Sequence, residues 1–225
     1  MKTEIILALD VDSPSKAKRF VNKLYPKVKT FKVGLQLFSA AGPAIIKFIN
    51  RKGGSVFLDL KFFDIPNTVA NAVRQAVRLK VKMFTLHISG GEAMLRAAVE
   101  AVKKESASLG VKEPLLIGVT VLTSVNKTKA TTDEVLKKAK LAKDAGLDGA
   151  VCSAQEAAAV RKACGEDFII VTPGIRPKGA DVGDQKRVAT AKDAIAAGAS
   201  YIVVGRPILE AKDPLEVVEG LIKEI

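Results

Sequence analysis

The sequence predicts an α/β fold, a single-domain (β/α)8 TIM barrel over residues 1–225, from three observations. Short β-rich apolar runs alternate with longer amphipathic stretches eight times along the chain. From the first expected strand to the eighth, the units recur about every 28 residues, close to the minimum for a strand–helix–strand unit. No linker or low-complexity segment interrupts this alternation, and 225 residues suit the compact end of the size range of such barrels.

The eight strands are expected where short runs rich in β-branched and aliphatic residues lie between turn signals. Residues 5–10, Ile-Ile-Leu-Ala-Leu-Asp, have the near-continuous apolar content of a strand that is buried on both faces. The expected strands are 5–10, 29–33, 55–61, 82–88, 114–120, 148–152, 168–172 and 200–204.

The eight helices are expected where longer amphipathic stretches follow these runs. Proline stands near the first turn of four of them, for example in Ser13-Pro14 and Asp213-Pro214. Glycine follows several helix ends, for example at Gly110 and Gly146. The expected helices are 14–25, 43–52, 66–79, 91–108, 131–145, 154–164, 190–197 and 213–224.

A doubly wound open sheet is the main alternative to the barrel. Such sheets carry a glycine-rich dinucleotide fingerprint in the first strand-to-helix turn when they bind dinucleotides. Here that turn, residues 9–14, reads Leu-Asp-Val-Asp-Ser-Pro and has no glycine. The barrel is therefore the preferred fold.

A formal charge of +12 is typical of proteins that bind polyanions. However, the lysines are spread along helical stretches with acidic residues between them. Aromatic residues make up only 5% of the chain, and no Trp is present to stack on bases. We therefore expect a solvated basic surface and no nucleic-acid partner, although the positive field would steer an anionic substrate.

Membrane and secretory roles are also disfavoured. No apolar run reaches the ~18 residues needed to span a bilayer, and the N-terminal segment lacks the features of a signal peptide. Two cysteines, Cys152 and Cys164, do not make a disulfide framework. We expect a cytoplasmic protein with no membrane partner.

The most informative segment is residues 59–68, Asp-Leu-Lys-Phe-Phe-Asp-Ile-Pro-Asn-Thr. It follows the apolar run 55–58, so its first residues should lie on a strand, where side chains two apart share a face. Asp59 and Lys61 then point the same way, and Asp64 is close enough to fold back toward Lys61. The prediction is an ammonium between two carboxylates. Because burying such charges is costly, the cluster indicates a site that needs a proton at neutral pH.

Polar residues also fall at the ends of the other strands, where the active site of a TIM barrel lies. Asp10 and Lys32 end the first two strands, and packing alone does not explain charged residues at such places. The structural alternative to an active site is that these charged residues form ion pairs that only fill the mouth of the barrel. The strand-end set is Asp10, Lys32, Asp59, Lys61, His87, Thr120, Thr123, Ser153, Thr172, Pro173, Gly174, Gly205 and Arg206.

The ends of the last two strands suggest a phosphate site, because loops there commonly bind phosphate through backbone N–H groups. Gly174 and Gly205 leave such groups open, and Arg206 adds a guanidinium. The polar segment 173–185 is long for a connection. It is expected to close over the ligand as a lid, with a plain surface loop as the alternative. The lid residues expected to contact the ligand are Arg176 and Gln185.

Other candidate residues are assigned structural roles. His87 is the only histidine, so a metal site with several histidine ligands cannot be built. Cys152 lies within an expected strand and should belong to the core. Residues 89–92, Ser-Gly-Gly-Glu, are expected to cap a helix.

These motifs resemble the orotidine 5′-monophosphate decarboxylases, in their bacterial form. The resemblance extends from residues 7–10, Leu-Ala-Leu-Asp, to residues 204–207, Val-Gly-Arg-Pro, which is nearly the whole chain. The pattern Asp-x-Lys-x-x-Asp alone is shared with sugar-phosphate decarboxylases and synthases of the same superfamily, but its continuation into Ile-Pro-Asn-Thr is specific. Phe63 is a departure, because the bacterial pattern usually has His there. The other matching segments are 31–34, 119–124, 172–177 and 184–185.

The resemblance implies that orotidine 5′-monophosphate is converted to uridine 5′-monophosphate, the last step of de novo pyrimidine synthesis, without a metal or organic cofactor. It implies that Lys61 protonates C6 of the pyrimidine and that Asp59 lies beside the departing carboxylate. Lys32 and Asp64 would complete the charged network. A homodimer is also implied, in which Asp64 and Thr68 reach the neighbouring subunit's site. The implied substrate contacts are Asp10 and Lys32 for the ribose, Thr123 near the base, Arg176, Gln185, Gly205 and Arg206 for the phosphate, together with Asp59, Ile65, Thr68 and Pro173.

The residue types suit this chemistry independently of the resemblance. Loss of CO2 from C6 leaves a carbanion whose orbital cannot delocalise into the ring, so stabilisation must be electrostatic, from a fixed cation. Two adjacent carboxylates keep a lysine in its charged form. Lys61 is therefore the expected source of both the positive charge and the proton.

Three other functions remain open at this point. A Mg²⁺-dependent 3-keto-gulonate-6-phosphate decarboxylase or hexulose-phosphate synthase would place a metal on the acidic residues. A Schiff-base aldolase would use Lys61 as its nucleophile, although the flanking carboxylates disfavour the neutral amine that it needs. A non-catalytic nucleic-acid-binding protein is the third.

Overall fold

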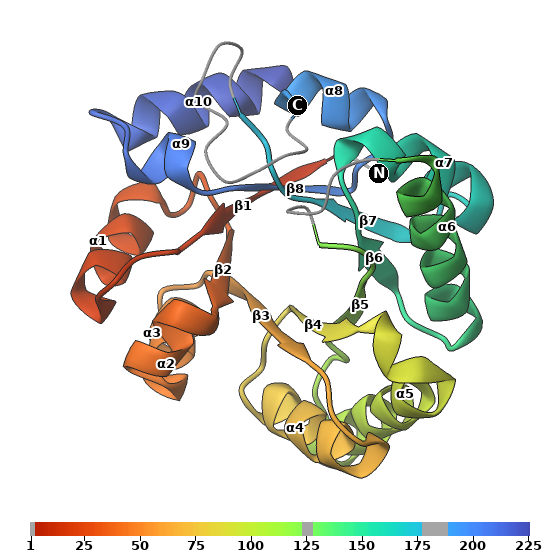
Figure 1. Ribbon diagram of the computed structural model, residues 1–225. Coiled ribbons are helices and arrows are strands. Elements are labelled where there is room, and N and C mark those ends of the chain that lie inside the picture. The colour runs from red at the N-terminus through yellow and green to blue at the C-terminus, as the bar shows by residue number, and fades with distance from the viewer. Residues whose placement is uncertain (1–2, 123–127, 177–188) are drawn as a thin grey trace.

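Eight parallel strands close into a barrel in the order β1 to β8, so that each strand lies beside its neighbours in sequence. The computed structural model describes residues 3–122, 128–176 and 189–225. Figure 1 looks into the barrel, with the strands in the centre and the helices around them. The predicted (β/α)8 fold is confirmed. The strands are β1 (Glu4–Ala8), β2 (Thr30–Gly34), β3 (Ser55–Phe62), β4 (Met83–His87), β5 (Leu115–Val119), β6 (Gly149–Val151), β7 (Ile169–Thr172) and β8 (Tyr201–Val204).

All eight predicted helices are present, with ends that differ from the prediction by no more than two residues. Proline stands in the first turn of α1, and the Ser13 hydroxyl accepts a hydrogen bond from the Lys16 N–H, as the sequence signal indicates. The helices are α1 (Pro14–Leu24), α2 (Leu35–Ala41), α3 (Pro43–Arg51), α4 (Pro66–Arg78), α5 (Gly91–Leu109), α6 (Lys129–Asp144), α7 (Ala154–Cys164), α8 (Ala191–Ala196), α9 (Arg206–Leu209) and α10 (Pro214–Glu224), with a 3-10 turn η1 (Ile88–Gly90).

Three short helical elements were not predicted: α2, η1 and α9. The helix α2 follows β2 directly, its N-cap residue Gly34 provides no side-chain cap, and so it has no start signal in the sequence. The helix α9 has only four residues, too few to show a helical repeat of apolar residues. Both follow strands at the barrel mouth.

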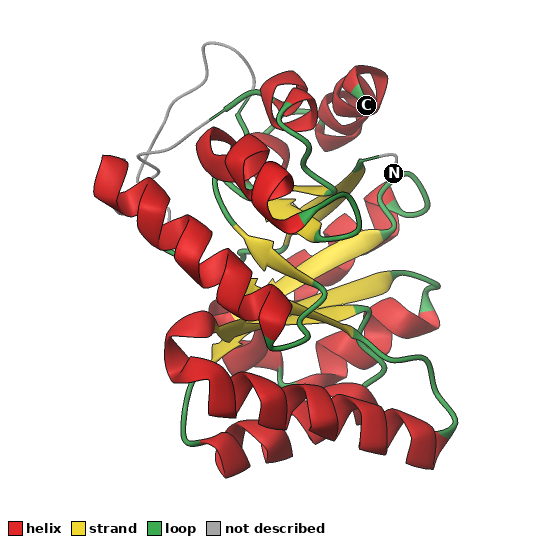
Figure 2. Ribbon diagram, turned by 90° about the vertical axis from the view of Figure 1, so that its right-hand side faces the viewer, coloured by secondary structure: helices red, strands yellow, loops and turns green. Residues whose placement is uncertain are grey.

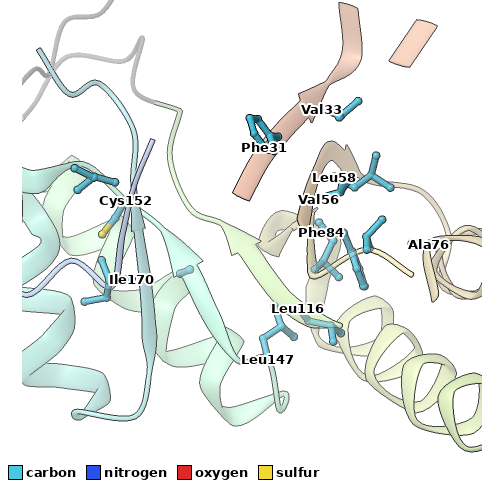
Figure 3. Packing of buried hydrophobic residues seen from close by; sticks show 14 of the residues in the cluster. Phe31, Val33, Val56, Leu58, Ala76, Phe84, Leu116, Leu147, Cys152 and Ile170 are labelled. Carbon is cyan, nitrogen blue, oxygen red and sulfur yellow. The ribbon is translucent and has the colours of Figure 1, made fainter. Parts of the chain in front are cut away.

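Alternate residues of the strands face either the barrel interior or the helices. Ile6, Phe57, Met83 and Tyr201 belong to the inner cluster, which fills the barrel. The larger outer cluster lies between the sheet and the helices. Figure 3 shows part of it, with Val56, Leu58 and Phe84 on the strands and Ala76 on α4.

The inward-facing register determines which side chains reach the barrel mouth. In β1, Ile6 and Ala8 face inward, so Asp10 lies on the same side two residues later. In β3, Phe57 faces inward, and Asp59 and Lys61 follow it at the same spacing. Figure 2 shows the barrel from the side, with helices flanking the strands. None of the helices in the described ranges is long and apolar enough to cross a membrane.

Candidate active site

Asp59 and Lys61 meet at the C-terminal end of β3, where this strand departs from regular pairing with β4. Leu58 pairs with Phe84 and Phe62 pairs with Leu86, so residues 59–61 lie opposite a single residue of β4. Lys61 adopts a φ of 52°, a left-handed conformation that is uncommon for residues other than glycine. The backbone of β3 is therefore irregular at this point, as strands often are next to active sites.

Four charged side chains of alternating sign run across the mouth of the barrel from β3 to β1. Lys61 Nζ lies 2.9 Å from Asp59 Oδ1, and Asp59 Oδ2 lies 3.5 Å from Lys32 Nζ. Lys32 Nζ in turn lies 2.8 Å from Asp10 Oδ1. We call these four residues, Lys61, Asp59, Lys32 and Asp10, the charged array. The predicted convergence of these strand-end residues is confirmed.

Gly34 leaves room for the close approach of two members of the array. A Cβ at this position would lie 3.1 Å from Lys32 Nζ and 3.4 Å from Asp10 Oδ1. Any side chain would therefore crowd the ion pair, which explains the glycine that ends the 31–34 motif.

The pKa values of two members of the array are shifted so that both stay charged at neutral pH. Burial alone would raise the pKa of Asp59, but attraction to Lys32 and Lys61 and the hydrogen bonds from Lys61 and Thr85 outweigh it, so the pKa is lowered. Burial alone would lower the pKa of Lys32, but Asp59 and Asp10 outweigh it, so this pKa is raised. The array is thus a fixed pattern of charge.

The charged array forms one side of a cavity of about 540 Å³, within the size range of small-ligand sites. Apolar side chains from other strands form much of the remaining wall, and Arg176, Arg206 and Glu210 add charged groups to it. The lining residues are Ala8, Asp10, Lys32, Phe57, Asp59, Lys61, Val119, Val121, Leu122, Val151, Val171, Pro173, Gly174, Arg176, Val203, Gly205, Arg206 and Glu210.

The residues expected to bind phosphate line the same cavity from the ends of β7 and β8. They are Gly174 after β7, and Gly205 and Arg206 after β8; Pro173, another expected substrate contact, lines it as well. Arg176 is buried and donates from Nη1 to the Ile175 carbonyl at 2.9 Å. Two other expected contacts, Thr123 and Gln185, lie outside the described residues, as does most of the segment expected to form a lid.

Asp64 does not lie where the sequence argument placed it. Its carboxylate accepts a hydrogen bond from the Ile65 N–H at 2.7 Å, ahead of α4, and the residue is exposed. Among the described residues of this chain, no ion pair joins Asp64 to Lys61. The expectation that Asp64 folds back onto Lys61 within one chain is wrong, because β3 continues to Phe62 and directs the following turn outward.

Several other strand-end residues are buried within the protein or bonded to it and do not line the cavity. The Thr120 hydroxyl donates to the Val151 carbonyl at 2.6 Å, and the buried Ser153 hydroxyl donates to Glu156. Thr172 is fully buried. Cys152 is buried in the outer cluster, as predicted.

His87 ends β4, with its ring centroid 5.7 Å from that of Phe63. Burial and the positive charges of Lys61 and Lys138 lower the pKa of His87, so that it is neutral at neutral pH. The helix α5 begins at Gly91 after this strand, as expected, but no side chain caps it. In the described ranges, no group of three or more His, Cys, Asp or Glu side chains is placed to hold a metal ion.

Phe57, Glu210 and Thr85 belong to the site or support it but were not predicted from the sequence. Phe57 looked like an ordinary core residue, and Glu210 follows the unpredicted helix α9. Thr85 could have been found from its place, because it is a polar residue between two inward-facing positions of β4, Met83 and His87. Its hydroxyl contacts both Asp59 and the backbone of Lys61.

Comparisons with known proteins agree with this fold. The family model "Orotidine 5′-phosphate decarboxylase / HUMPS family" matches residues 3–221. A curated relative from Moorella thermoacetica, named orotidine 5′-phosphate decarboxylase, is 48% identical, and the match covers 100% of this chain and 92% of the relative. A relative of the same name from Syntrophomonas wolfei is 48% identical, with 98% and 97% covered. The crystal structure of orotidine 5′-phosphate decarboxylase from Lactobacillus acidophilus is 37% identical, with a TM-score of 0.86 and 99% of each chain covered.

Proposed function

The chain belongs to the orotidine 5′-phosphate decarboxylase / HUMPS family, and we propose that it converts orotidine 5′-monophosphate to uridine 5′-monophosphate, the last step of de novo pyrimidine synthesis. Relatives named for this decarboxylase support the proposal, because one of them matches the whole chain at 48% identity. The structural observation that carries it is the charged array on the cavity wall, with a lysine ammonium held at its end by a carboxylate.

The proposed reaction needs no group beyond the side chains of the site. The bond between C6 and the substrate carboxylate breaks, and its electron pair stays on C6. The Lys61 ammonium stabilises this negative charge and transfers a proton to C6, which gives the product. CO2 leaves, and the neutral amine of Lys61 regains a proton from water. One proton is therefore consumed for each substrate molecule.

Asp59 has two tasks in this proposal. It holds the Lys61 ammonium at 2.9 Å, so that the cation does not have to be ordered during the reaction. It also places negative charge beside the substrate carboxylate, and this repulsion is relieved as CO2 leaves. A charge pair at about 4 Å contributes about 4 kcal/mol at an effective dielectric constant near 20. The most proficient enzymes lower their barriers by roughly 20 kcal/mol or more.

Contacts far from C6 must therefore contribute through binding and positioning. Asp10 and Lys32 lie at the far end of the charged array, where they would hold the ribose hydroxyls. Gly205, Arg206 and Arg176 would bind the phosphate. The other proposed contacts are Pro173, together with Thr123 near the base and Gln185 at the phosphate, both outside the described residues.

A homodimer is part of the proposal. Residues 63–68 are all exposed and carry two large apolar side chains, Phe63 and Ile65, which are 61% and 66% exposed. Leu35, which begins α2, is 59% exposed. A second subunit that covers these side chains would remove them from water. Asp64, Ile65 and Thr68 would then reach the neighbouring subunit's site, where Asp64 would complete the network around Lys61. As an enzyme of nucleotide synthesis, the protein would work in the cytoplasm.

Loss of the ultraviolet absorbance of orotidine 5′-monophosphate on addition of the purified protein tests the proposed function. The assay is run with EDTA and again with added Mg²⁺, and product is identified as uridine 5′-monophosphate. Equal rates in both conditions are expected. No turnover would contradict the proposal. Mg²⁺-dependent decarboxylation of 3-keto-gulonate 6-phosphate, or hexulose-phosphate synthase activity, would instead place the chain in the sugar-phosphate branch of the superfamily.

A further inference from the structure

The hydroxyl of Thr85 joins the backbone of Lys61 to the carboxylate of Asp59. Thr85 Oγ1 accepts a hydrogen bond from the Lys61 N–H at 2.9 Å and donates one to Asp59 Oδ1 at 2.9 Å. The same Oδ1 accepts a hydrogen bond from Lys61 Nζ at 2.9 Å. The backbone and the ammonium of Lys61 are thus tied together through one hydroxyl and one carboxylate oxygen.

This bridge lies where the pairing of β3 and β4 is interrupted. Residues 59–61 lie opposite Thr85 alone, and the hydroxyl accepts the hydrogen bond of the Lys61 N–H at this point. The φ of 52° at Lys61 is a conformation that persists only where the surroundings hold it. Thr85 is fully buried, so water does not compete for its two hydrogen bonds.

We propose that Thr85 is a positioning residue of the decarboxylation, which fixes the directions of the Lys61 ammonium and the Asp59 carboxylate without touching the substrate. This inference rests on the proposed function. Thr85 is not among the residues that line the cavity. It lies behind Asp59 and Lys61 and acts through them.

Thr172 shows that a threonine can be buried at the end of a strand in this barrel without such contacts. It is fully buried on β7, and in the described part of the chain its Oγ1 has no hydrogen-bond partner. Packing alone therefore does not account for the two hydrogen bonds of Thr85. These hydrogen bonds join Thr85 on β4 to Asp59 and Lys61 on β3.

Two pairs of variants separate the effect of the Thr85 hydroxyl from the effect of the side-chain volume. Thr85→Val keeps the shape and removes the oxygen, whereas Thr85→Ser keeps the oxygen. Thr85→Ala differs from Thr85→Ser by the oxygen alone and serves if the valine variant does not fold. Thr30→Val is the matched control, because Thr30 is a fully buried strand threonine whose hydroxyl contacts Lys82 at 3.4 Å, outside the site.

Steady-state kinetics with orotidine 5′-monophosphate should show kcat lowered on the order of 100-fold in Thr85→Val and Thr85→Ala, with a much smaller change in KM. Thr85→Ser should recover most of the lost kcat, and Thr30→Val should behave as the parent does. A kcat for Thr85→Val equal to that of the parent would overturn the proposal. Equal losses in Thr85→Ser and Thr85→Ala would overturn it as well, because the hydroxyl would then be irrelevant.

Hydrogen exchange of the Lys61 amide, followed by NMR, is a readout that needs no substrate. The amide should be protected in the parent and in Thr85→Ser, and should exchange at least about tenfold faster in Thr85→Val or Thr85→Ala. An unchanged exchange rate would overturn the role of the hydroxyl. If the parent does not decarboxylate the substrate, the proposed function fails, while the exchange rates still decide whether Thr85 holds Lys61.

Discussion

Lys32 and Asp59 face each other across neighbouring strands, with Nζ 3.5 Å from Oδ2, and each keeps the other charged. Burial alone would push both groups toward their neutral forms, but the pKa of Asp59 is lowered and that of Lys32 is raised by their mutual attraction and by their other partners in the charged array. The negative charge next to Lys61 is therefore present before any substrate binds.

Asp59→Asn should lower the free energy of unfolding by about 3 kcal/mol at neutral pH, because it leaves two ammonium groups without this partner. The folded-state pKa of Asp59 lies below 3.8, so the folded protein binds fewer protons than the unfolded one. Its stabilisation is thus present above the unfolded-state pKa and is lost as the pH falls through the folded-state pKa. Urea titrations at several pH values should show the difference between parent and variant shrinking on acidification; a constant difference would contradict the assignment.

Lys61→Ala should lower turnover by more than about 10⁴-fold, because it removes both the cation and the proton donor. Binding of uridine 5′-monophosphate should survive, since the phosphate and ribose contacts remain. Kinetics and calorimetry measure the two effects. Lys104→Ala is the matched control, because Lys104 is exposed on α5 and pairs with Glu100 of the same helix. If Lys61→Ala turned over substrate at nearly the rate of the parent, Lys61 would not be the proton donor.

Arg206→Ala should weaken the binding of uridine 5′-monophosphate by roughly 10- to 100-fold, the effect of losing a charge-assisted hydrogen bond. Binding of the nucleoside uridine should change little, because it has no phosphate. Arg96→Ala, which removes an exposed arginine paired with Glu92 on α5, should leave both affinities unchanged. If the parent binds nucleoside and nucleotide equally well, the phosphate site is misplaced.

Lys61→Ala and Asp64→Ala should each be inactive alone but should regain activity when mixed. In a symmetric dimer, Asp64 would serve the partner's Lys61, so a mixed dimer has one site with both changes and one intact site. After subunit exchange, roughly a quarter of all sites would be intact. Activity of the mixture is compared with that of each variant at the same concentration. A mixture that stays inactive despite subunit exchange would argue that Asp64 acts within its own chain.

Ile65→Glu should shift the protein from dimer to monomer and lower its activity in parallel, because it places a charge in the proposed interface. Sedimentation velocity over a range of concentrations measures the shift. Leu109→Glu is the matched control: Leu109 is a large apolar residue, 47% exposed, at the end of α5. An equal shift in both variants would mean that the effect is not specific to this surface.

The fold could be predicted because nearly every strand and helix carries its own local signal. Prolines and glycines mark the helix ends, and the strands are apolar because both of their faces are buried. The short helices α2 and α9 lack such signals, since the N-cap residue of α2, Gly34, has no side chain to cap it and α9 has only four residues.

The charged array could be predicted because its members are charged residues on otherwise apolar strands, placed together by the barrel. The position of Asp64 could not, because side-chain alternation gives a direction only while the backbone is a regular strand, and β3 is irregular at Lys61. Thr85 was missed for a related reason. Its inward-facing place on β4 could be read from the sequence, but its two hydrogen bonds depend on the broken pairing with β3, which no local pattern on β4 reveals.

A crystal structure with a uridine 5′-monophosphate analogue that carries an anionic substituent at C6 tests the central claim most directly. The Lys61 ammonium should lie within hydrogen-bond distance of that substituent, about 3 Å from it, while still contacting Asp59. An ammonium that points away from C6, with the nucleotide bound in the cavity, would contradict the account.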